Sequence, residues 1–151
     1  ITEGQIVLDR VIEGKNVYPP VGILPSLSRL MKDGIGEGFT REDHSDFTNQ
    51  LFASYSGAND AKSLASVIGE EELSDVDKLY LKFGELFEQK FVGQGQDETR
   101  TIQETLDLGW KLLGIFPREE LTRMDTEILD KYYKDTADEV LNQQTTDKPL
   151  V

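Results

Sequence analysis

One short stretch holds the residues of this chain that are best suited to chemistry other than packing. The stretch reads Ile23-Leu24-Pro25-Ser26-Leu27-Ser28-Arg29-Leu30, and Pro19 and Pro20 precede it. Proline fixes its own φ and pushes the residue before it toward extended geometry, so we expect a stiff, extended connector. We expect Leu27 and Leu30 to anchor this connector and Arg29 to point away from them.

Arg29 is the candidate for binding an anion. A planar, permanently charged guanidinium on a stiff loop can grip a carboxylate or a phosphate. The residues alone favour the simpler interpretation, in which Arg29 pairs with one of the 29 acidic residues of the chain. Ser26 and Ser28 have no histidine nearby in the sequence to form a nucleophilic triad, so Pro25, Ser26 and Ser28 are interpreted as support for the loop.

Three other patterns could carry chemistry, and each has a simpler structural interpretation. His44 is the one histidine and there is no cysteine, so a zinc site is not expected. The pair Asp75 and Asp77 resembles half of a calcium loop, but the glycine that such a loop needs is absent. The run 70–72, which is Glu-Glu-Glu, is typical of a solvated helix start. We therefore expect no metal site.

Composition limits the class of partner. The chain has 151 residues, enough for one domain, and a net charge of −13 with no cysteine. Nucleic acids and anionic membrane surfaces attract lysine and arginine, so neither is expected to bind, and basic partners are favoured. No run of about 18 apolar residues exists to cross a membrane. The start at Ile1 is interpreted as the start of a fragment.

We expect little regular structure in the N-terminal third of the chain. Residues 5–8, Gln-Ile-Val-Leu, should form a short strand whose partners lie upstream of the chain. Glycines at 34, 36 and 38 are interpreted as a hinge between two domains, because no Gly-Lys-Ser/Thr follows them to make a phosphate loop.

From Thr40 onward the pattern is that of helices. Thr40 with Asp43 fits a capping box that opens a helix over 41–56, with Gly57 as its stop. A shorter helix should follow from Asp60 and end at Gly69. Apolar residues at helical intervals after Ser74 predict the strongest amphipathic element, which extends to about Phe91.

The C-terminal part predicts three further elements. Thr101 and Glu104 open a helix with apolar residues on more than one side, which should lie at the centre of the bundle. Pro117 should open a short helix, and Asp125 should cap another over 126–133. The polar segment 135–151 has too few apolar residues to offset its ordering entropy and is expected to be largely disordered.

Several motifs together resemble the non-catalytic B (beta) subunit of V-type and A-type rotary ATPases, also called V-type ATP synthases. The likeness extends over nearly the whole chain. It rests on Ile1-Thr2-Glu3-Gly4-Gln5, Tyr18-Pro19-Pro20, Leu24-Pro25-Ser26-Leu27-Ser28-Arg29-Leu30, Thr40-Arg41-Glu42-Asp43-His44, Ile68-Gly69-Glu70 and Thr105-Leu106-Asp107-Leu108-Gly109-Trp110. One departure is Gly22, where the family pattern has Asp or Asn.

The resemblance implies roles for two segments. Arg29 would reach into the nucleotide site of the neighbouring catalytic A subunit as an arginine finger, with ATP or ADP and magnesium bound at the A/B interface of the full complex. The chain alone would bind no cofactor. An acidic element would face the central rotor stalk; in this chain it comprises Glu70, Glu71, Glu72, Leu73, Ser74, Asp75 and Asp77.

The expected fold is mainly α, a C-terminal helical bundle preceded by a short β and loop remnant of a P-loop nucleotide-binding domain. The expected divisions are residues 1–39 for that remnant, 40–134 for the bundle and 135–151 for the tail. The expected function is a non-catalytic subunit that couples ATP turnover to rotation and ion transport, in the cytoplasmic, membrane-peripheral head of the complex. Two alternatives stay open: a fragment of a catalytic rotary ATPase subunit, and an unrelated acidic helical interaction module.

Overall fold

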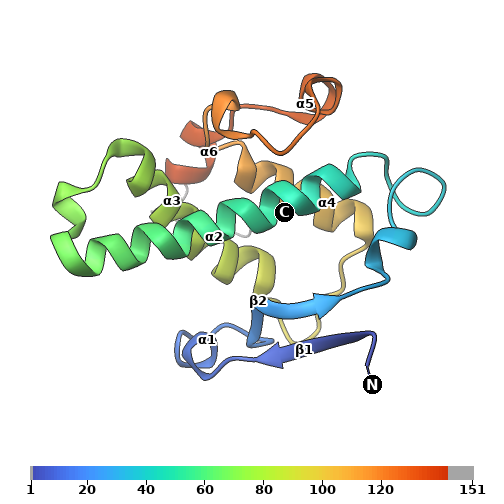
Figure 1. The fold of residues 1–151 in the computed structure, drawn as a ribbon, viewed down its shortest axis with the longest axis horizontal. Coiled ribbons are helices and arrows are strands. Elements are labelled where there is room, and N and C mark those ends of the chain that lie inside the picture. Colours follow the sequence, from blue (N-terminus) through green and yellow to red (C-terminus); the bar gives the residue numbers. More distant parts are fainter. Residues whose placement is uncertain (1, 143–151) are drawn as a thin grey trace.

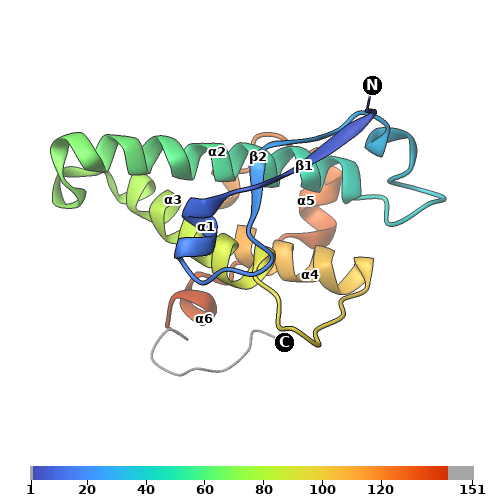
Figure 2. The same cartoon turned by 90° about the horizontal axis from the view of Figure 1, so that it is seen from below.

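The computed structural model describes residues 2–142 and shows a helical bundle with a β-hairpin along one side (Figure 1). A long helix, α2, lies across α3 and α4, and the hairpin crosses the bundle near the C-terminal end of α3 (Figure 2). The elements are β1 (Gly4–Leu8), α1 (Arg10–Gly14), β2 (Val21–Ser28), α2 (His44–Ile68), α3 (Asp75–Leu86), a π-helix (Phe87–Val92), α4 (Ile102–Leu113), α5 (Thr126–Tyr132), α6 (Ala137–Asn142), and 3₁₀ turns at Met31–Asp33, Glu70–Glu72 and Arg118–Glu120. The prediction of a mainly helical fold with a short β segment is confirmed.

The hairpin corrects two predictions about the N-terminal third. The partner of β1 does not lie upstream: β1 pairs antiparallel with β2, from Gly4 opposite Ser28 to Leu8 opposite Val21. The proline-rich connector is extended as predicted, and its backbone supplies the hydrogen bonds that a lone strand would lack. Leu27 and Leu30 do not anchor it as predicted, because both are more than half exposed, so other residues hold the connector.

Helix α2 is continuous, and the predicted stop at Gly57 is wrong. A Cβ atom at this position would lie 2.8 Å from Cε1 of Tyr80, so the glycine makes room for an aromatic ring of α3. Packing between the helices thus outweighs the low helix propensity of glycine. Gly69 is the real end of α2, because it has a φ of 91° that favours glycine.

The start of α2 is fixed by a buried ion pair in place of the predicted capping box. The carboxylate of Asp43 has no exposed surface, and it accepts hydrogen bonds from Arg41 Nε at 2.7 Å and Nη2 at 2.9 Å. Trp110 of α4 donates its indole N–H to the same carboxylate. Arg41 also binds Asp107 of α4 and lies over the ring of Tyr132, 4.8 Å from its centroid. This cluster joins α2, α4 and α5.

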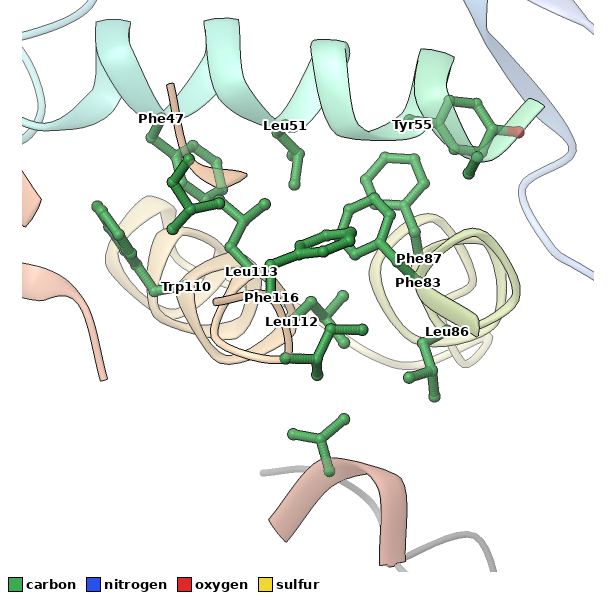
Figure 3. Packing of buried hydrophobic residues seen from close by; sticks show 14 of the residues in the cluster. Phe47, Leu51, Tyr55, Phe83, Leu86, Phe87, Trp110, Leu112, Leu113 and Phe116 are labelled. Carbon is green, nitrogen blue, oxygen red and sulfur yellow. The ribbon is translucent and has the colours of Figure 1, made fainter. Parts of the chain in front are cut away.

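Aromatic side chains make up much of the core between α2, α3 and α4 (Figure 3). Phe83, Phe87 and Phe91 stack at helical spacing, with ring centroids 5.7 and 5.1 Å apart. Tyr55 packs on Phe87 from α2, and Phe116 packs on Phe83. The prediction of a strongly amphipathic element after Ser74 is confirmed, although its last turns are π-helical.

The structure confirms the prediction for α4 and corrects the prediction for the C-terminal tail. Thr101 and Glu104 form the capping box of α4, and Leu106 of this helix is fully buried. The predicted tail is wrong in part, because residues 137–142 form α6 and bury Val140 beside the core. One buried valine and a hydrogen bond from Val140 N to Thr136 O, 2.8 Å long, help order this turn. The rest of the predicted tail lies outside the described residues.

The Asp43 cluster generates a stability prediction. Burial alone would raise the pKa of Asp43, but the hydrogen bonds from Arg41 and Trp110 outweigh it and hold that pKa below its ordinary value. Asp43→Asn leaves Arg41 without its buried charge partner, so the free energy of unfolding should fall by about 3 kcal/mol, measured by urea denaturation. Asp107→Asn, which alters an exposed partner of the same arginine, should cost about 0 to 1 kcal/mol.

The same variant should change the dependence of stability on pH. A carboxyl group whose pKa is lowered by folding adds stability above its unfolded pKa of about 3.9, and this stability is lost as the pH falls through the folded pKa. The original chain should therefore lose stability more steeply below about pH 4 than Asp43→Asn does. Equal acid slopes for the two proteins would show that Asp43 is not the group responsible.

Candidate functional site

Arg29 lies directly after β2, at the end of the hairpin strand. Its side chain is 65% exposed, and its guanidinium approaches Glu3 with Nη1 to Oε2 at 3.9 Å, a long and solvated ion pair. The backbone is held more firmly, because Arg29 N donates to Glu3 O at 2.9 Å. The guanidinium is thus accessible while its backbone is fixed, unlike the largely buried guanidinium of Arg41.

Ser26 supports the strand that carries Arg29. Its hydroxyl donates to Gly22 O at 2.6 Å and accepts from Val7 N at 3.0 Å, which bridges the irregularity in strand register between Gln5 and Val7. The carbonyl of Pro25 accepts from the Gln5 side chain at 3.1 Å. Ser26 and Pro25 thus take part in hydrogen bonds within the hairpin next to Arg29, and their role in supporting a functional loop stays a prediction.

The backbones of β1 and β2 also approach each other closely at the remaining residues of this segment. Ser28 lies opposite Gly4 in the ladder, and a Cβ atom at Gly4 would lie 2.8 Å from Leu27 O, so the strands approach closely here. At Gly22, a Cβ atom would lie 3.2 Å from Cγ of Pro25. The glycine that departs from the family pattern therefore gives the proline ring room in this chain.

Many exposed apolar side chains lie in the N-terminal part of the chain, on the hairpin that ends at Arg29 and on its flanking segments. Large apolar side chains of a single domain are normally scattered on its surface, and a concentration of them marks a surface that contacts other protein. The more than half-exposed members in residues 6–39 are Ile6, Leu8, Val11, Tyr18, Leu27, Leu30 and Phe39.

The acidic segment forms a separate site at the far end of α2. Gly69 ends the helix, the 3₁₀ turn Glu70–Glu72 follows, and the carboxylates of this turn are exposed. Leu73 is buried and anchors the turn to the bundle, while Val67 and Ile68 are exposed beside it. Arg29 follows β2 and the acidic turn follows α2, and the C-terminal ends of these two elements lie on opposite sides of the molecule (Figure 1), so the structure does not bring the two together.

Ser74 and the two aspartates form the start of α3. Ser74 Oγ accepts from Asp77 N at 3.1 Å and donates to Asp77 Oδ2 at 2.6 Å, which confirms the predicted cap. Asp75 is exposed in the first turn, where a negative charge favours the helix dipole. Within residues 2–142, no group of side chains has the composition and spacing to hold a metal ion.

His44 has a structural environment. Its Nδ1 lies 2.9 Å from Thr40 Oγ1, and burial lowers its pKa despite the nearby charge of Asp43. A neutral imidazole bonded to a threonine hydroxyl at the start of α2 agrees with the structural role expected for it.

The sequence interpretation missed a buried ion pair. Glu88 in the π-helix binds Lys15 through Oε2 and accepts a hydrogen bond from Tyr55 OH through Oε1 at 3.0 Å. Burial and the charge of Glu88 raise the pKa of Tyr55 well above its usual value, so the phenol stays a donor. The only signal for this ion pair in the sequence was the position of Glu88 next to the apolar face of the predicted helix. Glutamates in such positions are usually solvated, so the signal was weak.

The described residues include no helix with the length and apolar character needed to span a bilayer. The family model for the C-terminal domain of V and A type ATP synthase matches residues 33–133. The chain is similar over much of its length to named subunits of these enzymes. It is 63% identical over 134 residues to V-type ATP synthase beta chain 2 of Clostridium tetani, a match that covers 89% of this chain and 29% of that protein.

Two further comparisons agree. The B subunit of the A-type ATP synthase of Saccharolobus islandicus is 59% identical over 133 residues, which cover 88% of this chain and 29% of the relative. A solved structure of the ATP synthase subunit NeqB from Nanoarcheaum equitans superimposes with a TM-score of 0.69 at 40% identity, over 75% of this chain and 28% of that one. The chain thus spans less than a third of the length of these relatives. It belongs to the family of V- and A-type ATP synthase C-terminal domains, as part of a beta, or B, subunit.

Proposed function

We propose that this chain is the C-terminal part of a non-catalytic B subunit that lends Arg29 to the nucleotide site of a neighbouring catalytic A subunit. The observation that supports the proposal is the contrast at Arg29 between an accessible guanidinium and a fixed backbone. A residue that serves a neighbouring site needs both properties, since it must extend from its own subunit without losing its position.

The chemistry fits an arginine. Phosphoryl transfer spreads negative charge over the equatorial oxygens of the transferred group, and an arginine finger that stabilises this charge contributes roughly 10³ to 10⁵ in rate. ATP or ADP with magnesium would be bound at the A/B interface of the full complex. This chain contributes the guanidinium, which can donate two parallel hydrogen bonds to phosphate oxygens.

The apolar residues around Arg29 support a location at an interface. The set that includes Ile6, Leu27 and Phe39 would be covered in the complete subunit or by its neighbour. Residues 1–39 are proposed as the edge of the nucleotide-binding domain and the residues from 40 onward as the helical domain. Gly36 and Gly38, whose positive φ angles favour glycine, lie at the proposed boundary between the two.

The acidic turn is proposed to face the central rotor stalk. Its exposed carboxylates would meet lysine and arginine side chains, and the adjoining Val67 and Ile68 would supply apolar contact. Through this contact, ATP turnover would be coupled to rotation and ion transport in the cytoplasmic, membrane-peripheral head of the complex.

The comparisons argue against both alternative functions, each for a different reason. An acidic module unrelated to rotary ATPases is excluded, because the chain belongs to the family. The alternative of a catalytic subunit fragment is disfavoured, because the relatives from Clostridium tetani and Saccharolobus islandicus are named as beta chain and B subunit, respectively.

The first functional prediction concerns Arg29. In full-length subunits assembled with the A subunit, Arg29→Ala should lower steady-state ATP hydrolysis by orders of magnitude, at most about 10⁵. Arg29→Lys should restore little, because lysine keeps the charge but loses the planar fork. A coupled assay of ADP release would measure both.

Glu3→Gln is the matched control for this prediction. It removes the ion-pair partner of Arg29 and leaves the guanidinium in place, so hydrolysis should stay near that of the unaltered complex. Normal hydrolysis by an assembled Arg29→Ala complex, or equal losses from Arg29→Ala and Glu3→Gln, would contradict the proposal.

The second functional prediction concerns the acidic turn. Neutralising Glu70, Glu71, Glu72 and Asp75 to Gln or Asn should weaken binding of the assembled head to the stalk and flatten its dependence on ionic strength. Folding should be nearly unchanged, because exposed charges contribute little to stability. Titrations of labelled stalk at several salt concentrations would measure the effect.

The control for the second prediction neutralises an equal number of exposed carboxylates elsewhere. It should leave both affinity and salt slope near their original values, and it alters Asp97, Glu119, Glu127 and Asp138. If the two sets of substitutions change binding equally, the acidic turn acts only through net charge and has no specific contact with the stalk.

A further inference from the structure

The π-helix at the end of α3 touches the segment that carries Arg29. Gly93 N donates to Glu88 O at 2.9 Å, the i to i−5 spacing of a π-helix, and single π turns are frequent at functional positions. At this point the backbone of Gln94 donates to Tyr18 O at 2.6 Å. Figure 2 shows α1 and the start of β2 beside the C-terminal end of α3.

Glu88 is the charged centre of this contact. Its side chain is only 11% exposed, and both carboxylate oxygens are used, one by Lys15 and one by Tyr55. The neighbouring Gln89 donates to Lys15 O at 3.3 Å. A carboxylate at this depth is costly unless it is paired, so the pair gives the contact one preferred arrangement.

Apolar residues complete the contact. Ile12 and Val17, on either side of Lys15, are buried in the same core cluster as Phe87. The loop 15–18 is therefore fixed to the bundle by side chains and backbone together. From Tyr18 the chain runs into β2, which the hydroxyl of Ser26 clamps to β1.

These contacts form a continuous path between the two proposed sites. Ser74, next to the acidic turn, caps the start of α3. Glu88 in the π-helix at its other end binds Lys15, and Gln94, just beyond the π-helix, binds Tyr18. The hairpin then carries the path to Arg29. Helix α3 and the π-helix that follows it are continuous, so displacement of the acidic turn would be passed through them to the arginine segment.

We propose that the Glu88–Lys15 pair is a latch that positions the Arg29 segment relative to α3 and transmits the state of the acidic turn to it. Glu88 and Lys15 are positioning residues, which act through the hairpin and touch no substrate. This inference rests on the proposed function for the role of Arg29 and of the stalk, but the latch itself can be measured without catalysis.

The test uses full-length B subunit assembled with the A subunit, with and without the central stalk. Hydrogen exchange in residues 3–28 and at Gln94 should change when the stalk binds the unaltered complex. This change should shrink by roughly 5-fold or more in Glu88→Gln and in Lys15→Met, a factor at the lower end of typical coupling between two sites. Methionine is unbranched like lysine, one atom shorter, and uncharged.

Hydrolysis gives the second readout. Both variants should keep the rate of the stalk-free assembly, because the pairing of β1 with β2 and the bond from Arg29 N to Glu3 O still hold the backbone of Arg29. They should lose the change in rate that the stalk produces. Glu139→Gln is the matched control, since it removes another ion pair between elements, that of Glu139 with Lys111, away from the hairpin. It should preserve the response to the stalk in both measurements.

Three outcomes would overturn the latch. In the first, the change in hydrogen exchange on stalk binding is the same in both variants as in the unaltered complex. In the second, both variants lose the same fraction of the hydrolysis rate with and without the stalk. In the third, neither variant assembles, which would make the pair a folding requirement. If Glu88→Gln alone fails to assemble, Lys15→Met decides, because Lys15 is the more exposed partner. Failure of the proposed function can be told apart from failure of the latch. If the proposed function is wrong, the Arg29→Ala complex keeps normal hydrolysis, while the change in hydrogen exchange on stalk binding still reports on the latch.

Discussion

The buried carboxylate of Asp43 is the interaction on which the arrangement of the helices depends. A desolvated charge must be paired, and here Arg41 and Trp110 satisfy it from two directions. The pairing fixes the first turn of α2 against α4, and the stacking of Arg41 on Tyr132 adds α5. Once this end of α2 is fixed, its length of 25 residues sets where the acidic turn lies.

Local sequence signals predicted the elements whose causes are local. The capping box of Thr101 and the stop at Gly69 are each decided by a few neighbouring atoms, and both are confirmed. The predictions for Gly57 and Asp43 were wrong for the opposite reason. The ring of Tyr80 and the indole of Trp110 reach them from distant parts of the chain, and these contacts outweigh the local preference.

The candidate site was predictable to the same degree. Prolines fix backbone angles locally, so the extended segment before Arg29 could be predicted. The predicted anchoring of that segment by Leu27 and Leu30 was wrong, because both side chains are more than half exposed. The strand β1 was predicted, but its pairing with β2 was not, because pairing depends on a chain reversal that the sequence does not specify strongly. Glu88 was missed because its partner Lys15 is distant in sequence, and only the folded chain brings the two together.

The central claim is that Arg29 serves a nucleotide site in the neighbouring subunit. The most direct test is an experimental structure of the full-length B subunit assembled with the A subunit and a magnesium complex of a non-hydrolysable ATP analogue. The account predicts that the guanidinium of Arg29 leaves Glu3 and donates to a phosphate oxygen of the analogue at about 3 Å. An Arg29 side chain that stays on Glu3 of its own chain, with the analogue bound beyond its reach, would contradict the account.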